Sequence, residues 1–109
     1  MGLFDIFKST KAYQELTATD FMAGISSDQN VVILDVRTAS EFAAGHLKGA
    51  IKMDFLSGEF AQKLDSLDTS KSYYVYCRSG NRSSAACKQL AKIGCEKVYN
   101  LIGGYGSVA

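Results

Sequence analysis

Apolar and polar positions follow two different patterns along the chain, and together these patterns predict an α/β domain. Runs of consecutive apolar or aromatic residues occupy positions 31–34 and 73–76, with shorter candidates at 50–51 and 98–99. Continuous runs of this kind are typical of strands that are covered on both faces, as in a parallel sheet. We therefore expect these four runs to be strands of one mostly parallel sheet.

The segments between the runs have the spacing and the end signals of helices. Thr38 and Glu41 form a capping-box pattern at the start of a short helix, and Gly45 is expected to end that helix. Thr19 is expected to cap another helix, which ends near Gly24. Apolar stripes predict two further helices, over residues 60–67 and 83–93.

The order of strands and helices limits where chemistry takes place. Strands that alternate with helices form a parallel sheet through right-handed crossovers. In such sheets the ligands bind at the carboxyl ends of the strands. Side chains that directly follow a predicted strand are therefore the first candidates for a functional site.

Composition and charge exclude several classes of function. The chain has 109 residues and a net charge of +1, which suits one domain and gives no strong attraction to nucleic acid or to an anionic membrane. No apolar run approaches the ~18 residues of a membrane span, so no stable membrane anchor is expected. Three cysteines are too few and odd for a secreted disulfide framework. We expect a cytoplasmic protein with an N-terminal arm over residues 1–12 and a domain over residues 13–109.

A cysteine stands at the end of the strongest predicted strand. The segment CRSGNRS, residues 77–83, places Cys77 between that strand and the next helix. Loop amides and a helix N-terminus lower the pKa of a thiol at such a position, and Arg78 and Arg82 add two cations. Because the thiolate is the nucleophilic form, Cys77 is predicted to be a nucleophile.

At this point the sequence resembles a known family. The segment from Cys77 to Arg82 resembles the active-site loop of the rhodanese-like sulfurtransferases. Residues 35–51, with Asp35-Val36-Arg37 and Gly45-His46-Leu47, resemble the family's second signature, and residues 100–105 resemble its closing Gly-Gly turn. The resemblance implies a single rhodanese-like domain: a central, mostly parallel five-stranded sheet flanked by helices on both faces.

The resemblance also implies a reaction. Cys77 takes a sulfane sulfur from thiosulfate or a persulfide donor, holds it as a persulfide, and passes it to cyanide or to a thiol, including a thiol of a protein partner. No metal or organic cofactor is implied. The substrate-binding residues are then Arg78, Ser79, Gly80, Asn81 and Arg82, and the supporting residues are Asp35, Arg37 and Ser83.

Several of these residues also have purely structural interpretations. Asp35 is expected to cap loop amides, Arg37 to pair with Glu41, and His46 to make a structural hydrogen bond. The thiols of Cys87 and Cys95 are expected to be buried and inert, although either would resolve a Cys77 persulfide if it reached the site.

Two alternative functions remain open. One is a persulfide carrier that serves a protein partner and turns over small molecules slowly. The other is a cysteine-dependent phosphatase or arsenate reductase, a chemistry that uses five residues between its cysteine and its arginine to enclose a tetrahedral oxyanion. Here only four residues separate Cys77 from Arg82, which favours sulfur transfer.

Overall fold

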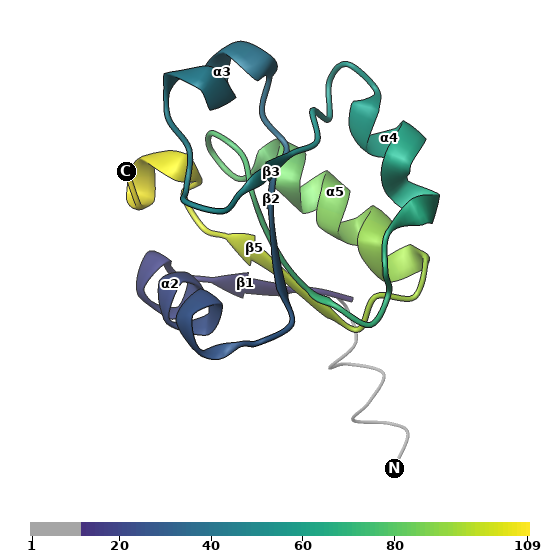
Figure 1. Cartoon of the computed structure of the whole chain (residues 1–109). Helices are drawn as coiled ribbons and strands as arrows, with labels where there is room; N and C mark the ends of the chain where they lie inside the picture. Colours follow the sequence, from purple (N-terminus) through teal and green to yellow (C-terminus); the bar gives the residue numbers. More distant parts are fainter. Residues whose placement is uncertain (1–11) are drawn as a thin grey trace.

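The protein is built around one parallel sheet, seen in a computed structural model that describes residues 12–109 (Figure 1). The predicted N-terminal arm, residues 1–12, lies outside the described residues except for Ala12. The sheet has the order β1-β5-β4-β2-β3, and every neighbouring pair is parallel. The strands are β1 (Gln14–Leu16), β2 (Val31–Asp35), β3 (Ile51–Lys52), β4 (Ser72–Tyr76) and β5 (Lys97–Leu101).

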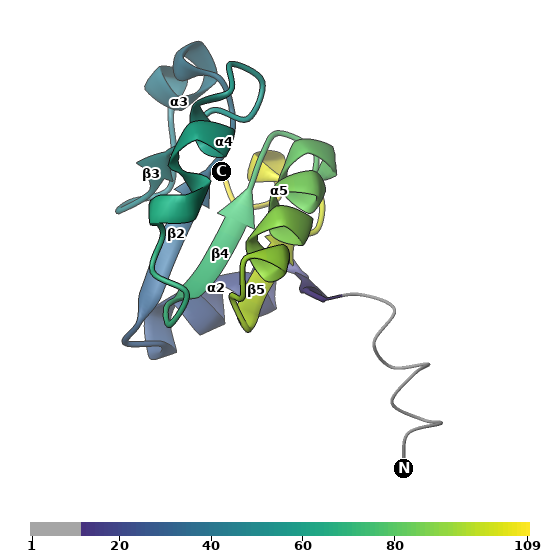
Figure 2. The same cartoon turned by 90° about the vertical axis from the view of Figure 1, so that its right-hand side faces the viewer.

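The predicted α/β architecture is confirmed, with helices on both faces of the sheet. Figures 1 and 2 show α4 and α5 on one face and α2 on the other, with α3 beyond the carboxyl ends of the strands. The helices are α2 (Ala18–Ser27), α3 (Ala39–Ala44), α4 (Glu59–Lys63) and α5 (Asn81–Lys92), with short 3-10 helices η1 (Leu64–Ser66) and η2 (Tyr105–Ser107). Within the described residues, no helix is long and apolar enough to cross a membrane.

Each face of the sheet carries its own apolar core. On the α5 side, Val75 and Val98 pack with Cys87 and Leu90 of the helix and with Phe60 of α4. A second set covers the α2 side: Phe21, Ile33, Tyr74, Tyr76 and Leu101. All five residues of β4, the central strand, are buried, and burial on both faces explains the apolar run over its last four residues, 73–76.

Some predicted boundaries are wrong, each for a local reason. Thr17, not Thr19, caps α2, because its hydroxyl accepts the Asp20 amide at 3.3 Å. Gly24 does not end that helix but lies inside it, where a side chain would overlap the Tyr74 ring. The predicted helix over 60–67 is α4 followed by η1, and Leu64 and Leu67 still pack on the core.

Two of the predicted helices lie beside the candidate site, and one is confirmed while the other begins earlier than predicted. The helix after Thr38 is confirmed as α3, with the capping box present and Gly45 at its end. The helix predicted to begin at Ser83 begins at Asn81 instead, directly after Gly80, whose φ of 109° lies in the left-handed region. Asn81 and Arg82 therefore belong to the first turn of α5 rather than to a loop.

Candidate active site

Cys77 lies at the carboxyl end of β4, where the chain turns into α5 (Figure 1). Its side chain is fully buried. Residues 77–82, which we call the cysteine loop although its last two residues are the first two of α5, pass around the sulfur. The register places Asp35 of β2 opposite Tyr76 and Asn100 of β5 opposite Val75. The carboxyl ends of β2, β4 and β5 therefore lie side by side next to this loop.

The Cys77 sulfur is surrounded by hydrogen-bond donors. The Gly80 amide donates to Sγ at 3.0 Å and the Ser83 amide at 3.4 Å. The Ser83 hydroxyl lies 3.3 Å from the same atom. Burial by itself raises the pKa of this thiol, but the hydrogen bonds from Ser83, Gly80 and Ser79 outweigh burial and hold the pKa below its ordinary value. The arrangement favours a thiolate, the nucleophilic form of cysteine.

The Gly-Gly turn after β5 holds the cysteine loop in place. The Tyr105 amide donates to the Cys77 carbonyl at 2.8 Å. Gly104 is buried with φ 68° and ψ −162°, and a Cβ at this position would overlap the backbone of Arg78. This close backbone approach explains the glycine, because only glycine leaves room for it.

The predicted pairing of Arg37 with Glu41 is wrong. Arg37 is buried and binds the Asp35 carboxylate through Nε at 2.9 Å and Nη2 at 2.7 Å. Its Nη2 also donates to the Gly45 carbonyl at 2.6 Å, and its guanidinium lies 4.2 Å from the centre of the Tyr105 ring. Asp35 accepts the Arg37 amide at 3.0 Å, as expected for a residue that caps a loop amide. The pair ties the end of β2 to the loops around it.

Glu41 instead binds Arg82 of the cysteine loop. The two side chains are joined by hydrogen bonds of 2.9 and 3.2 Å. The Arg82 guanidinium, helped by the Thr38 cap, lowers the pKa of Glu41 to about 2, so this carboxylate is ionised at neutral pH. Arg82, which was predicted to add a cation beside the sulfur, shares its charge with Glu41 in this ion pair. Arg78 is exposed, and within residues 12–109 it forms no ion pair.

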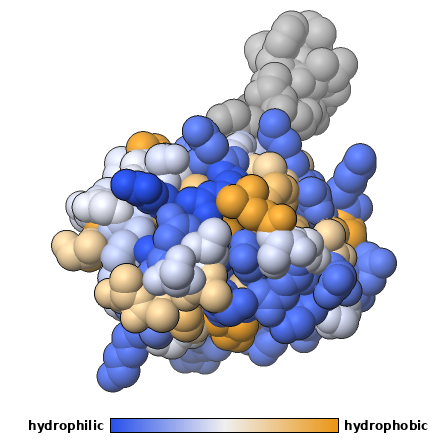
Figure 3. Space-filling model, turned by 90° about the horizontal axis from the view of Figure 1, so that it is seen from above, coloured by the Kyte–Doolittle hydropathy of each residue, from blue (hydrophilic) through white to orange (hydrophobic). Residues whose placement is uncertain are grey.

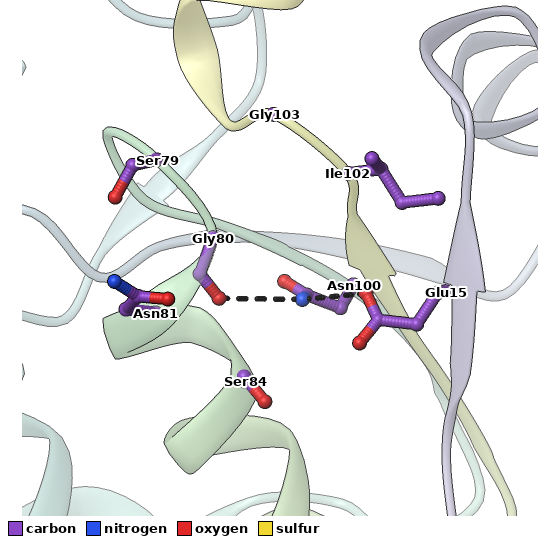
Figure 4. A pocket seen from close by; sticks show the side chains of 8 residues that line it. All are labelled: Glu15, Ser79, Gly80, Asn81, Ser84, Asn100, Ile102 and Gly103. Atoms are coloured by element: carbon purple, nitrogen blue, oxygen red, sulfur yellow. Dashed lines mark hydrogen bonds between the residues drawn. The ribbon is translucent and has the colours of Figure 1, made fainter.

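Cavities flank the cysteine loop on two sides. One of about 370 Å³ is lined by Arg37, Glu41, Ala44, Arg78, Tyr105 and Gly106. Another of about 390 Å³ is lined by Glu15, Ser79, Gly80, Asn81, Ser84, Asn100, Ile102 and Gly103 (Figure 4). Figure 3 shows the face at the carboxyl ends of the strands, where hydrophilic surface is interrupted by separate hydrophobic groups. This face therefore has a hollow on either side of the cysteine loop.

The contacts of His46, Cys87 and Cys95 are those of structural residues. His46 Nδ1 lies 2.9 Å from the Phe42 carbonyl, and its ring stacks on the Phe42 ring at 3.7 Å, as the structural interpretation predicts. Cys87 and Cys95 are buried, and burial raises the pKa of both thiols. Among residues 12–109, no group of three or more His, Cys, Asp and Glu side chains is placed to hold a metal ion.

Sequence reasoning missed one side chain that contacts the cysteine loop and a second that binds the first. Asn100 donates to the Gly80 carbonyl at 3.4 Å and to Glu15 at 2.9 Å (Figure 4). A polar residue inside the otherwise apolar end of a strand is a signal that identifies Asn100. Glu15 lies on β1, a strand of three residues without an apolar run, and nothing in the sequence places it there.

Comparisons with known proteins agree with this geometry. The model of the rhodanese-like domain family matches residues 17–109. The chain is 37% identical to the uncharacterised protein YqhL of Bacillus subtilis over 90 residues, which are 83% of this chain and 68% of YqhL. It is 33% identical to the thiosulfate sulfurtransferase GlpE of Pseudomonas fluorescens over 78 residues, covering 72% of this chain and 70% of GlpE.

Two further relatives extend the comparison. YrkF of Bacillus subtilis, whose name designates a candidate sulfur carrier, is 29% identical over 97 residues. These are 89% of this chain, which spans only 51% of YrkF. Among solved structures, a rhodanese-like domain protein from Staphylococcus aureus superposes with a TM-score of 0.77 at 25% identity, covering 88% of this chain and 91% of the other.

Proposed function

Since the chain belongs to the rhodanese-like domain family, we propose that it is a sulfurtransferase that carries a sulfane sulfur as a persulfide on Cys77. The observation that supports this most is the ring of donors around the sulfur: the amides of Gly80 and Ser83 and the Ser83 hydroxyl. These groups stabilise a thiolate before the reaction. They also stabilise the anionic persulfide after it, in the manner of an oxyanion hole.

The proposed reaction has two displacement steps. The Cys77 thiolate attacks the outer sulfur of thiosulfate, the sulfur–sulfur bond breaks, and sulfite leaves with the bonding electron pair. Cyanide or an acceptor thiolate then attacks the outer sulfur of the persulfide, and the Cys77 thiolate leaves. With a persulfide donor the same first step releases a thiolate. Each step exchanges one sulfur bond for another, so no external oxidant or reductant enters.

The size of the cysteine loop supports sulfur rather than phosphate chemistry. Four residues separate Cys77 from Arg82, and the Gly80 amide lies 3.0 Å from the sulfur itself. The donors therefore converge on one sulfur atom. A phosphatase or arsenate reductase needs its donors to converge on a tetrahedral anion beyond the sulfur, with an arginine free to bind the anion. Arg82, the arginine in the corresponding place, is held by Glu41.

A persulfide carrier for a protein partner is the second candidate function. The relative YrkF supports it, because its name designates a candidate sulfur carrier. The full burial of Cys77 also limits how small donors approach the thiol. A carrier forms the same Cys77 persulfide but transfers its sulfur slowly to small thiols or cyanide. The rate of turnover therefore distinguishes the two functions, whereas formation of the persulfide does not.

Mass spectrometry of the intact protein tests the proposal. Incubation with thiosulfate is expected to add one sulfur atom that maps to Cys77 and is removed by a small thiol. Loading by an organic persulfide alone, without turnover of thiosulfate and cyanide, favours the carrier. No gain of sulfur from either donor would contradict both functions.

The ion pair at Arg82 leads to a prediction about donor charge. Glu41→Gln frees the Arg82 guanidinium, while glutamine still fits the third helical position of a capping box. A half-buried ion pair of this kind is worth less than about 1 kcal/mol, so kcat/KM for the dianion thiosulfate is expected to rise about two- to fivefold. An alkyl hydropersulfide ionises only to a monoanion and so carries less charge than thiosulfate, and its kcat/KM is expected to rise by a smaller factor.

Glu96→Gln is the matched control for the Glu41 variant. It removes the same charge from an exposed position just before β5, at the opposite end of the sheet. It is expected to leave the ratio of the two kcat/KM values unchanged. An equal rise with both donors in Glu41→Gln would show that the loop had loosened and that charge does not select the donor.

A further inference from the structure

Asn100 is a buried polar side chain beside the apolar core on the α5 side of the sheet. It shares the α5-facing side of β5 with Val98, and only 2% of it is exposed. Its Nδ2 donates both to Glu15 Oε1 at 2.9 Å and to the Gly80 carbonyl at 3.4 Å, the two dashed contacts in Figure 4. Glu15 lies directly opposite Asn100 in the β1–β5 register. One amide group therefore joins the edge strand to the cysteine loop.

Gly80 is held at both of its polar groups. Its carbonyl accepts from Asn100 and from the Ser84 amide, the latter at 3.1 Å, while its own amide donates to the Cys77 sulfur at 3.0 Å. Gly80 has a φ of 109°, and a glycine has a wide range of allowed backbone conformations. Steric restriction alone therefore does not set the direction of the Gly80 N–H. The two groups are attached to one Cα, and only the φ and ψ rotations separate them, so holding the carbonyl restricts the directions in which the amide points.

The side-chain oxygen of Asn100 adds nothing to the stability of the fold. Oδ1 is the one buried side-chain oxygen or nitrogen within residues 12–109 that has no hydrogen-bond partner. Burying an unpaired acceptor costs free energy, and an apolar side chain of similar shape avoids that cost. The neighbouring cavity of about 390 Å³, lined in part by Asn100, leaves space for such a side chain.

We propose that Asn100 is a positioning residue for sulfur transfer: its amide aims the Gly80 N–H at the Cys77 sulfur, and Glu15 orients that amide across the strand pair. The inference rests on the proposed function, since it assigns Asn100 to the same reaction. Asn100 touches neither the sulfur nor a substrate. It acts through Gly80, so its effect is on the thiolate and on the persulfide that the Gly80 amide stabilises.

The test is the pH dependence of Cys77 alkylation in Asn100→Leu. The rate of reaction with iodoacetamide, followed on the Cys77 peptide by mass spectrometry, reports the thiolate fraction. Losing the aimed Gly80 amide is expected to move the midpoint up by about one pH unit, which is about a tenfold loss of thiolate below the midpoint. The rate of sulfur transfer near neutral pH is expected to fall by a similar factor, while the melting temperature does not fall.

Two variants keep the test decisive. Val98→Ala, on the same face of the same strand, is expected to lower the melting temperature and to leave the alkylation midpoint unchanged. Should Asn100→Leu fail to fold, Glu15→Leu, at a half-exposed position, is expected to raise the midpoint by a smaller amount. A folded Asn100→Leu, or in its absence Glu15→Leu, with the wild-type midpoint overturns the inference.

The wild-type protein separates this inference from the proposed function. A low wild-type midpoint that Asn100→Leu leaves unchanged refutes the role of Asn100 alone. A wild-type midpoint in the ordinary range for cysteine contradicts the role of Asn100 and also removes the main support for a Cys77 persulfide.

Discussion

Cys77→Ser is expected to abolish sulfur transfer, with a loss of at least about 1,000-fold in the turnover of thiosulfate and cyanide. A serine hydroxyl is not ionised near neutral pH even among the donors of the cysteine loop, and an oxygen nucleophile forms no persulfide. The fold is expected to persist, since serine is slightly smaller than cysteine and its oxygen accepts the amides of Gly80 and Ser83 that now bind the sulfur. The measurements on this variant are the turnover of thiosulfate and cyanide, and the gain of sulfur by mass spectrometry of the intact protein.

The other two cysteines provide the controls. Cys87 and Cys95 are buried among apolar groups, and burial raises the pKa of both thiols, which keeps them protonated. Cys87→Ala and Cys95→Ala are therefore expected to load and release sulfur at wild-type rates, with some loss of stability from the small cavities they create. If Cys87→Ala remained folded but lost turnover, a mechanism that uses Cys77 alone would be wrong.

Much of the fold could be predicted because its signals are local. The apolar runs of β2 and β4 reflect burial on both faces of a parallel sheet, and the capping box of α3 lies within four consecutive residues. The place of the candidate site in the fold could be predicted for the same reason, since Cys77 directly follows a strand and Gly80 directly precedes a helix. Local sequence therefore identified the cysteine and the turn that surrounds it.

The partners of these residues could not be predicted, because they come from distant segments. Glu41 lies on α3 and meets Arg82 across the carboxyl edge of the sheet, a pairing that depends on how α3 packs. Arg37 is close to Glu41 in sequence but turns back to Asp35, where it is buried. The three residues of β1 have no pattern of their own, and only pairing with β5 makes them a strand. Tertiary packing, not local preference, decides each of these contacts.

Gly104→Ala is expected to have the second largest effect, through the shape of the cysteine loop. The added Cβ would overlap the backbone of Arg78, and the φ of 68° with ψ of −162° is a conformation that is essentially restricted to glycine. Relief requires the turn after β5 to move away from the loop, which strains the hydrogen bond from the Tyr105 amide to the Cys77 carbonyl. We expect a loss of about 3 kcal/mol in the free energy of unfolding.

Sulfur transfer by Gly104→Ala is expected to fall at least about tenfold, beyond what unfolding explains, because the amides around the sulfur lose their alignment. Gly49→Ala is the matched control: Gly49 also has a positive φ, of 84°, but a Cβ there meets nothing within 4 Å. It carries backbone strain alone, so it is expected to cost about 1 kcal/mol of stability and no activity. Denaturant unfolding and turnover are measured on both variants. Equal activity in the two would mean that contact between the Gly-Gly turn and Arg78 does not shape the cysteine loop.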